Sequence, residues 1–174
     1  MDIILNGQPR SVDFAPGISL LQLLRNELGL RSMKDGCAPE GSCGACTVIV
    51  DGRPVVSCAQ GAERFEGKAV ETLEGLPEAS RELWAAAFSA TGASQCGYCT
   101  PGIVMKSEAL LRREEDPGRE VITKALAGNL CRCTGYLAII DAIEQVAAAR
   151  NGGPRPAPHP GAAVGDPAPK YRSR

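Results

Sequence analysis

Eight cysteines carry the most distinctive chemistry in this sequence, and they fall into two groups of four. The groups are Cys37, Cys43, Cys46 and Cys58, and then Cys96, Cys99, Cys131 and Cys133. Thiols can form disulfides, act as redox dithiols or bind soft metal ions as thiolates. The first residues reach Asn6-Gly7 before an apolar signal sequence could form, so we expect a cytoplasmic protein. Because the cytosol keeps thiols reduced, metal binding is the favoured role.

The spacing of the first group is close to that of an iron–sulfur site. Its ligands would follow the order Cys37-x5-Cys43-x2-Cys46 with Cys58 further on. A plant-type ferredoxin holds a 2Fe–2S cluster with the order C-x4-C-x2-C and a distant fourth cysteine. Gly36, Gly41 and Gly44 would let the backbone fold around the inorganic core and direct N–H groups at its sulfur atoms. The first group therefore predicts a 2Fe–2S site.

The second group has the order C-x2-C and then C-x-C, and it calls for a different kind of site. On a regular strand the two thiols of C-x-C would lie on one face but two residues apart, so closing one cluster requires a turn. Thr100 and Thr134 each follow a cysteine directly and precede a predicted helix, and we expect them to be N-caps. Two helices would then point their positive N-terminal ends at an anionic cluster.

Two other roles for the cysteines stay open at this point. Two four-cysteine zinc sites are one alternative, because C-x2-C is also common in zinc ribbons. A redox dithiol of the thioredoxin type is the other, but it leaves six cysteines without a role. The near-ferredoxin spacing of the first group favours iron–sulfur clusters over both.

Mixed strands and a helix are predicted to position the first group, within residues 1–76. We expect strands at residues 2–5 and 11–14 around an Asn6-Gly7 turn, and a Ser19-capped helix that ends at Gly29. A second hairpin turns at Asp51-Gly52 and places Cys46 opposite Ser57, next to Cys58. Its return strand contains a proline, which indicates a sheet edge, and residues 69–72 form a last strand.

Helices are predicted to position the second group, within residues 77–150. The expected ranges are 78–90, 103–114, 120–127 and 137–150, which together form a small helical bundle. From residue 151 to residue 174 the chain contains six prolines and four glycines, with the sole histidine, His159. This composition predicts a tail or linker.

The overall composition excludes several classes of function. Nineteen basic and twenty acidic side chains give a net charge of −1, and aromatic residues are 4%, so a nucleic-acid binder is not indicated. No apolar run approaches the roughly 18 residues that a membrane helix needs. The sequence also lacks GxGxxG, a phosphate loop and a catalytic Ser, His or Cys cluster, so we expect no catalytic residues on this chain.

Three long motifs extend the argument from chemistry to a family. They are LysAspGlyCys with SerCysGlyAlaCysThrVal (34–37 and 42–48), GlnCysGlyTyrCysThrProGly (95–102) and GlyAsnLeuCysArgCysThrGlyTyr (128–136). In this order they resemble the small iron–sulfur subunit of the molybdenum hydroxylases, the family of xanthine dehydrogenase, aldehyde oxidoreductase and carbon monoxide dehydrogenase. The resemblance covers residues 1 to about 150.

This resemblance implies a fold and a set of ligands. It implies an α+β chain with a plant-type ferredoxin-like (β-grasp) domain at residues 1–76 and a four-helix-bundle domain at residues 77–150. Each domain would hold one 2Fe–2S cluster on its own four cysteines. Gln95 and Cys133 would approach the molybdopterin of a partner. One departure is the five-residue spacing between Cys37 and Cys43, where the family commonly has four.

The resemblance also implies a function and partners. Electrons from the molybdenum centre would pass through the helical-domain cluster and then the ferredoxin-like cluster towards FAD or another acceptor. The partners would be a molybdopterin-binding large subunit and an FAD-binding medium subunit. A free ferredoxin-like carrier is the competing hypothesis, and the second, helical domain argues against it.

Overall fold

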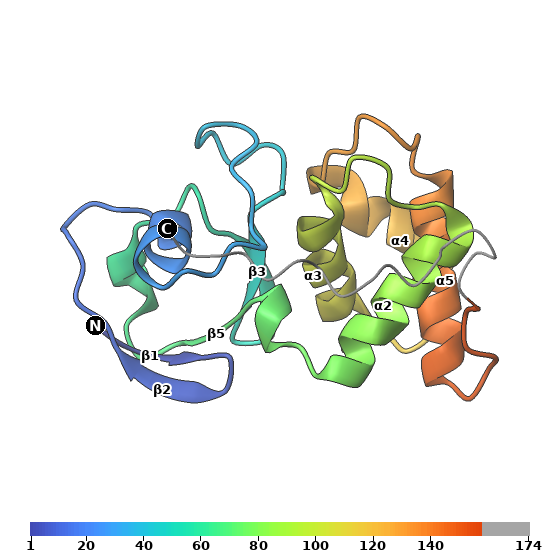
Figure 1. The fold of residues 1–174 in the computed structure, drawn as a ribbon, viewed down its shortest axis with the longest axis horizontal. Helices are drawn as coiled ribbons and strands as arrows, with labels where there is room; N and C mark the ends of the chain where they lie inside the picture. The colour runs from blue at the N-terminus through green and yellow to red at the C-terminus, as the bar shows by residue number, and fades with distance from the viewer. Residues whose placement is uncertain (158–174) are drawn as a thin grey trace, which may run out of the picture.

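The computed structural model describes residues 1–157, and the prediction of a tail at residues 151–174, including His159, falls mostly outside that range. Figure 1 shows a mixed β-sheet on one side of the molecule and the α-helices α2 to α5 on the other. The chain is therefore an α+β protein, as predicted from the sequence. No helix in the described part of the chain is long and apolar enough to cross a membrane.

The sheet has five strands in the order β2-β1-β5-β3-β4. Their bounds are β1 Asp2–Leu5, β2 Gln8–Ser11, β3 Thr47–Val50, β4 Arg53–Val56 and β5 Ala69–Glu71. Strand β5 lies in the centre, parallel to β1 and antiparallel to β3. Because β5 pairs with one strand of each preceding hairpin, β1 and β3, it joins both hairpins into one sheet.

The first hairpin differs from the sequence prediction. Its return strand is β2, Gln8–Ser11, and not residues 11–14. Asn6 and Gly7 both have positive φ angles of 50° and 78°, which is the two-residue turn favoured in hairpins. Such a turn pairs Leu5 directly with Gln8, so the return strand must begin at once. The prediction identified the turn correctly but placed the return strand three residues too late.

The structure confirms the hairpin predicted around Asp51-Gly52. Val50 pairs with Arg53 across the Asp51-Gly52 turn, and β4 is an edge strand of the sheet. Beyond the ladder, the Ser57 main-chain N–H and hydroxyl donate to the Cys46 carbonyl at 3.5 and 2.7 Å. This register carries two cysteines of the first group to the same end of the hairpin.

The helix after Ser19 packs against the sheet and shares an apolar core with it. Ser19 and Gln22 form a reciprocal capping box, and α1 (Leu20–Gln22) continues as a π-helical turn over Leu23–Glu27. Four leucines of this segment are buried: Leu20, Leu21, Leu23 and Leu24. Each contributes roughly 1.5–3 kcal/mol through burial of its side chain. Two 3-10 turns, Ala62–Phe65 and Leu73–Gly75, complete this half of the molecule.

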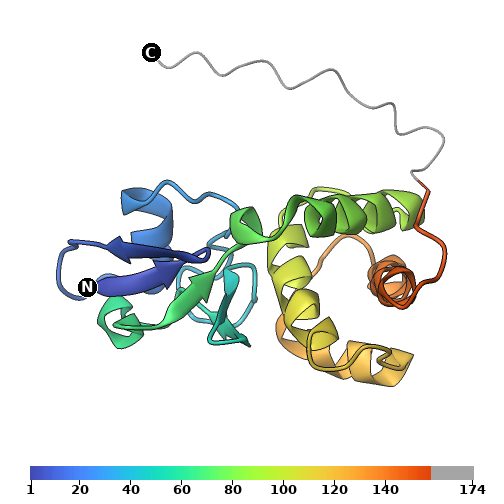
Figure 2. The ribbon, with the colours of Figure 1, turned by 90° about the horizontal axis from the view of Figure 1, so that it is seen from below.

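Four α-helices and one 3-10 turn make up the second half. They are α2 Glu78–Thr91, α3 Thr100–Leu111, α4 Arg119–Ala125, the turn Leu126–Gly128 and α5 Leu137–Arg150. Figure 2 shows α5 end-on where α2 runs across the view, so these helices cross. Trp84, Ile103, Ile139 and Ile143 are fully buried between them. The predicted range for α5 is confirmed, whereas α3 begins three residues before its predicted start.

An ion network on α3 joins the two halves. Arg112 donates to both carboxylate oxygens of Glu71 on β5, at 2.6 and 2.9 Å, and to Glu108 at 3.0 Å. Glu108 also accepts hydrogen bonds from Trp84 at 2.8 Å and from Arg150. Burial alone would raise the pKa of the Glu108 carboxyl, but these hydrogen bonds outweigh it and the pKa is lowered. The network fixes α3 against the sheet.

Candidate metal centres

All eight cysteines are free thiols in the structure. Within residues 1–157 no three or more His, Cys, Asp or Glu side chains gather in the geometry of a single-ion site. The cysteines of each group instead act on one another as neighbours. The Cys96 and Cys133 sulfurs lie 3.6 Å apart, and the Cys58 main-chain N–H donates to the Cys46 sulfur. Cys37 and Cys43, and likewise Cys99 and Cys131, are close enough for one thiol to shift the pKa of the other.

The first group lies at the end of the second hairpin. Cys37 and Cys43 belong to the partly exposed loop before β3, whereas Cys46 and Cys58 are buried. The Cys58 main-chain N–H donates to the Cys46 sulfur at 3.4 Å. The hairpin register described above therefore holds these two thiols together.

Main-chain N–H groups act on the sulfur atoms of this loop. Those of Cys43 and Ser42 lower the pKa of the Cys37 thiol to about 7. Burial, and then the adjacent Cys46 sulfur, raise the pKa of Cys58 to about 12. Iron bound to these sulfurs would replace their protons and favour the thiolate in every case.

Two glycines of the loop are required by close packing. A Cβ atom on Gly36 would lie 3.1 Å from the Cys43 sulfur. Gly44 has a φ of 68°, and a Cβ there would lie 2.3 Å from the Gly128 carbonyl oxygen. Gly44 thus has a steric role beside its predicted one of folding the loop around the cluster, and at Gly44 the crowding comes from the helical half.

The second group lies at the start of α3 and in the loop before α5. Cys99 is the N-cap residue of α3, so this helix begins at a predicted ligand. Burial raises the pKa of Cys99 to about 12, and the hydrogen bond with Cys131 adds to this effect. The Cys133 and Cys96 sulfurs lie 3.6 Å apart, and both residues are exposed.

The predicted threonine caps are wrong. Thr100 is the first residue of α3, and its hydroxyl contacts Ser94 at 3.2 Å. Helix α5 begins after Tyr136, which has a left-handed backbone, and the Thr134 hydroxyl lies 3.1 Å from the Cys131 sulfur. Thr134 is therefore a partner of a cysteine, because the turn that closes the C-x-C pair takes up the residues before the helix.

Gln95 is exposed and adjacent to Cys96, at the same end of the helical half as Cys133. These are the two residues that the family resemblance places near a partner's molybdopterin. Their common exposure leaves them accessible to a second protein.

The second group of cysteines and Cys43 of the first group line one cavity of about 170 Å³. Its walls combine Gly36, Cys43 and Ala45 of the first loop with the second group and with Tyr98, Leu130 and Arg132. Tyr98, Asn129 and Tyr136 were not predicted from the sequence as site residues. All three stand within the quoted motifs, next to or between cysteines, and that position was the available signal.

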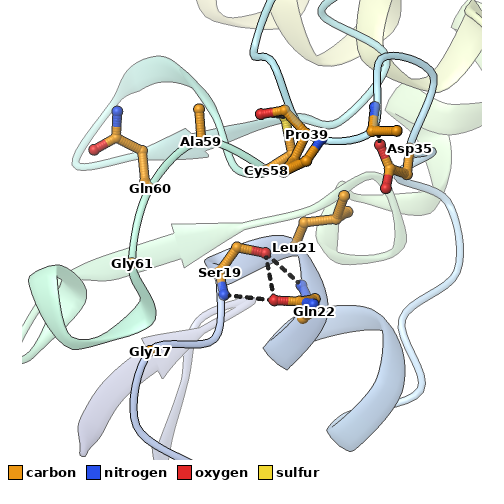
Figure 3. Close-up of a pocket in the computed structure, with 11 residues that line it drawn as sticks. Gly17, Ser19, Leu21, Gln22, Asp35, Pro39, Cys58, Ala59, Gln60 and Gly61 are labelled. Atoms are coloured by element: carbon orange, nitrogen blue, oxygen red, sulfur yellow. Dashed lines mark hydrogen bonds between the residues drawn. The ribbon is translucent and has the colours of Figure 1, made fainter.

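A larger cavity of about 530 Å³ is lined by Cys58 of the first group. Figure 3 shows Cys58 and Pro39 on one side of it and Ser19 and Gln22 on the other. Its polar lining comes from segments far apart in the sequence, so no sequence pattern indicated this cavity.

Comparison with known proteins identifies the family. Residues 3–77 match the family described as "2Fe-2S iron-sulfur cluster binding domain", and residues 72–144 match the family described as "[2Fe-2S] binding domain". The nicotinate dehydrogenase small FeS subunit of Eubacterium barkeri is 47% identical over 144 residues, which are 82% of this chain and 91% of that protein. The chain belongs to the small iron–sulfur subunits of the molybdenum hydroxylases.

Other relatives of this small iron–sulfur subunit support the same family. The xanthine dehydrogenase iron-sulfur-binding subunit of Escherichia coli O157:H7 is 42% identical, over 82% of this chain and 91% of that protein. Quinoline 2-oxidoreductase from Pseudomonas putida 86 superposes with a TM-score of 0.79 at 39% identity, over 87% of this chain and 96% of that chain. Aldehyde oxidoreductase from Desulfovibrio gigas gives 0.81 at 36% identity, but this chain covers 17% of it.

Proposed function

We propose that this chain is the electron-relay subunit of a molybdenum hydroxylase and that it holds two 2Fe–2S clusters. One observation carries the proposal, namely that the fold gathers the eight cysteines into two groups of four, with Cys58 hydrogen-bonded to the Cys46 sulfur in one group and all four cysteines around one cavity in the other. A 2Fe–2S cluster has two irons and four cysteine ligands, so four thiols per site is the required number. When bound, each cluster accepts and releases one electron.

The residues present fit such clusters in their chemistry as well as in their grouping. Thiolates are the soft ligands that iron–sulfur clusters require. Main-chain N–H groups already face the sulfur of Cys37, and hydrogen bonds to sulfur stabilise its negative charge. A structural zinc site is the alternative, and it needs four thiolates around a single ion.

The relay that we propose runs from the helical half to the sheet half. The exposed pair, Cys96 and Cys133, would face a molybdopterin-binding large subunit, with Gln95 beside the pterin. Cys58 of the first group lines the larger cavity, and there FAD of a medium subunit, or another acceptor, would receive the electrons. The chain itself oxidises no substrate.

We further propose two domains, a ferredoxin-like β-grasp domain at residues 1–76 and a four-helix domain at residues 77–150. Two separate apolar cores support this division, one under the sheet and one between the helices. Ile49 of β3 belongs to the core of the helical half, so the two domains pack directly against each other.

The test is a spectrum and a purification from the native host. A 2Fe–2S protein absorbs visible light and gives a paramagnetic signal on reduction, with two irons and two sulfides per cluster. A colourless protein that contains zinc would contradict the proposal. A relay subunit co-purifies with a large molybdenum-containing chain, whereas elution of the red protein alone would favour the free carrier.

A further inference from the structure

The segment from Asn129 to Cys131 lies directly against the loop of the first group. The Leu130 main-chain N–H donates to the Cys43 carbonyl oxygen at 2.8 Å. The Asn129 side chain donates to the Gly44 carbonyl oxygen at 3.0 Å and reaches the Thr47 hydroxyl at 3.3 Å. A predicted ligand of one site, Cys43, is therefore hydrogen-bonded to the residue next to a predicted ligand of the other, Cys131.

The Tyr136 hydroxyl makes two hydrogen bonds to the main chain of this segment. It accepts a hydrogen bond from the Cys131 main-chain N–H at 2.8 Å and donates to the Asn129 carbonyl at 3.0 Å. These two contacts flank Leu130 on either side. Tyr136 therefore fixes the direction of the Leu130 N–H.

Glycine makes the close approach possible. A Cβ on Gly102 of α3 would lie 2.3 Å from the Gly44 carbonyl oxygen, and Gly44 is equally crowded by the Gly128 carbonyl. The main chain at Gly44 thus lies directly against the main chain of α3 and of Gly128. Asn129, which fills the remaining space, is buried.

We propose that the hydrogen bond from Leu130 N–H to the Cys43 carbonyl is the main electronic bridge between the two sites, an inference that rests on the proposed function. The path from the Cys43 sulfur to the Cys131 sulfur runs through covalent bonds except at this hydrogen bond. One electron leaves the helical-half cluster, which is oxidised, and enters the first cluster, which is reduced. No bond forms or breaks, and no proton is transferred.

A second connection exists, and it is longer. The Tyr98 hydroxyl donates to the Asp35 carbonyl at 2.6 Å, so it also links the two loops. From Cys99 this path crosses the tyrosine side chain and then Asp35 and Gly36 before it reaches Cys37. Electronic coupling falls with each additional bond, so this path contributes less than the bridge at Leu130.

The exposure of the cysteines agrees with the position of the bridge. Cys96 and Cys133 of the second group are exposed and so accessible to a donor. Cys58 of the first group lines the larger cavity. The proposed route therefore enters at the exposed ligands, crosses the bridge from Cys131 to Cys43 and ends at Cys58.

The test measures electron transfer between the clusters in the full complex. Replacing Leu130 by its α-hydroxy acid changes the main-chain amide to an ester, which removes the N–H donor and keeps the side chain. We expect the intercluster rate, after rapid injection of one electron, to fall several-fold, and the magnetic coupling between the reduced clusters to weaken. Leu130→Ala keeps the main-chain N–H donor, so any decrease in the intercluster rate that it causes comes from loss of the leucine side chain.

Tyr136→Phe and Tyr98→Phe form a matched pair that compares the two connections. Tyr136→Phe keeps the ring but frees the bridging segment, so we expect a slower intercluster rate, unchanged reduction potentials and faster hydrogen exchange of the Leu130 amide. Tyr98→Phe removes the longer connection and should slow transfer less. If the ester variant does not assemble, Tyr136→Phe decides the result.

Two results separate this proposal from the proposed function. Variants that keep both clusters at wild-type potentials and transfer electrons at the wild-type rate would overturn the bridge and leave the relay in place. A larger effect of Tyr98→Phe than of Tyr136→Phe would assign the bridge to Tyr98 instead. A wild-type chain without 2Fe–2S clusters would overturn the proposed function itself.

Discussion

Each cysteine is assigned to one of the two sites, so the ligand assignment can be tested one residue at a time. Cys43→Ala removes one thiol of the first group and leaves the second group intact. Because its four proposed ligands come from one loop and one hairpin, we expect the first cluster to be lost and the helical-half cluster to remain. Electron paramagnetic resonance of the reduced protein should then show one signal in place of two.

Cys99→Ala is the converse variant, since Cys99 belongs to the second group. It should leave the signal of the first cluster. Two distinct signals in either variant would mean that the assignment of ligands to sites is wrong.

Gly44 tests how closely the two halves pack. Gly44→Ala adds a Cβ that would lie 2.3 Å from the Gly128 carbonyl, at a φ of 68°. The positive φ costs about 1–2 kcal/mol for alanine, and overpacking adds about 1–3 kcal/mol. Denaturant unfolding of the protein should show the combined loss of stability.

Gly52→Ala is the matched control for this substitution. Gly52 has a φ of 76° with nothing within 4 Å of a Cβ, so the variant has the backbone strain without the clash. Equal destabilisation by the two substitutions would show that the contact of Gly44 with the helical half is not energetically important.

At the residue scale, the sequence was sufficient to group the cysteines but not to find their supporting side chains. Spacing along the chain identified both groups of four, and the structure brings members of each group into contact. The hydroxyl of Tyr136 was not predicted because its partners, Asn129 and Cys131, lie in an irregular turn whose shape depends on tertiary contacts. The threonine caps failed for the same reason.

At the scale of elements, hairpins were predicted well where turn chemistry sets the register. The Asp51-Gly52 turn fixed the pairing of β3 with β4, and hence the contact between Cys46 and Cys58. The first hairpin was misplaced although its turn was identified, because the alternation of its return strand is weak and β2 is exposed throughout. Helix α5, with a continuous apolar face, was predicted over its full range.

The ion network on α3 gives a prediction at this scale. Glu108 is 4% exposed, and it accepts hydrogen bonds from Trp84, Arg112 and Arg150. Glu108→Gln leaves the Arg150 guanidinium without a carboxylate partner, whereas Arg112 keeps its pair with Glu71. We expect a loss of about 2 kcal/mol in the free energy of unfolding, less than for fully buried pairs because both arginines remain partly exposed. Glu71→Gln, at the exposed end of the same network, should cost about 0.5–1 kcal/mol.

The lowered pKa of Glu108 also predicts a pH dependence. A carboxyl with a lower pKa in the folded state stabilises the protein above its ordinary pKa of about 4.3, and this contribution is lost as the pH falls through the folded-state value. The stability difference between wild-type and Glu108→Gln should therefore be constant near neutral pH and shrink in acid. A difference that grows as the pH falls would contradict the role of the network.

At the scale of the whole molecule, the family and the two-site organisation followed from three motifs, but the contact between the halves did not. The sequence separates Cys43 from Leu130 by most of the helical half, and no periodicity relates them. Their hydrogen bond arises because α3 packs against β3 and brings the loop before α5 onto the first cysteine loop. Such a contact depends on tertiary packing, which single-sequence patterns do not encode.

The unequal exposure of the two sites leads to a last prediction, on the isolated chain and the assembled enzyme. Cys96 and Cys133 are exposed, whereas Cys46 and Cys58 are 1% and 3% exposed. A chelator reaches exposed ligands first, so the isolated subunit should lose its helical-half cluster before the other. In the complex a partner that covers this end should slow that loss, while the loss of the first cluster changes less. Iron release followed by paramagnetic resonance distinguishes the two clusters, and equal protection of both sites would place the partner elsewhere.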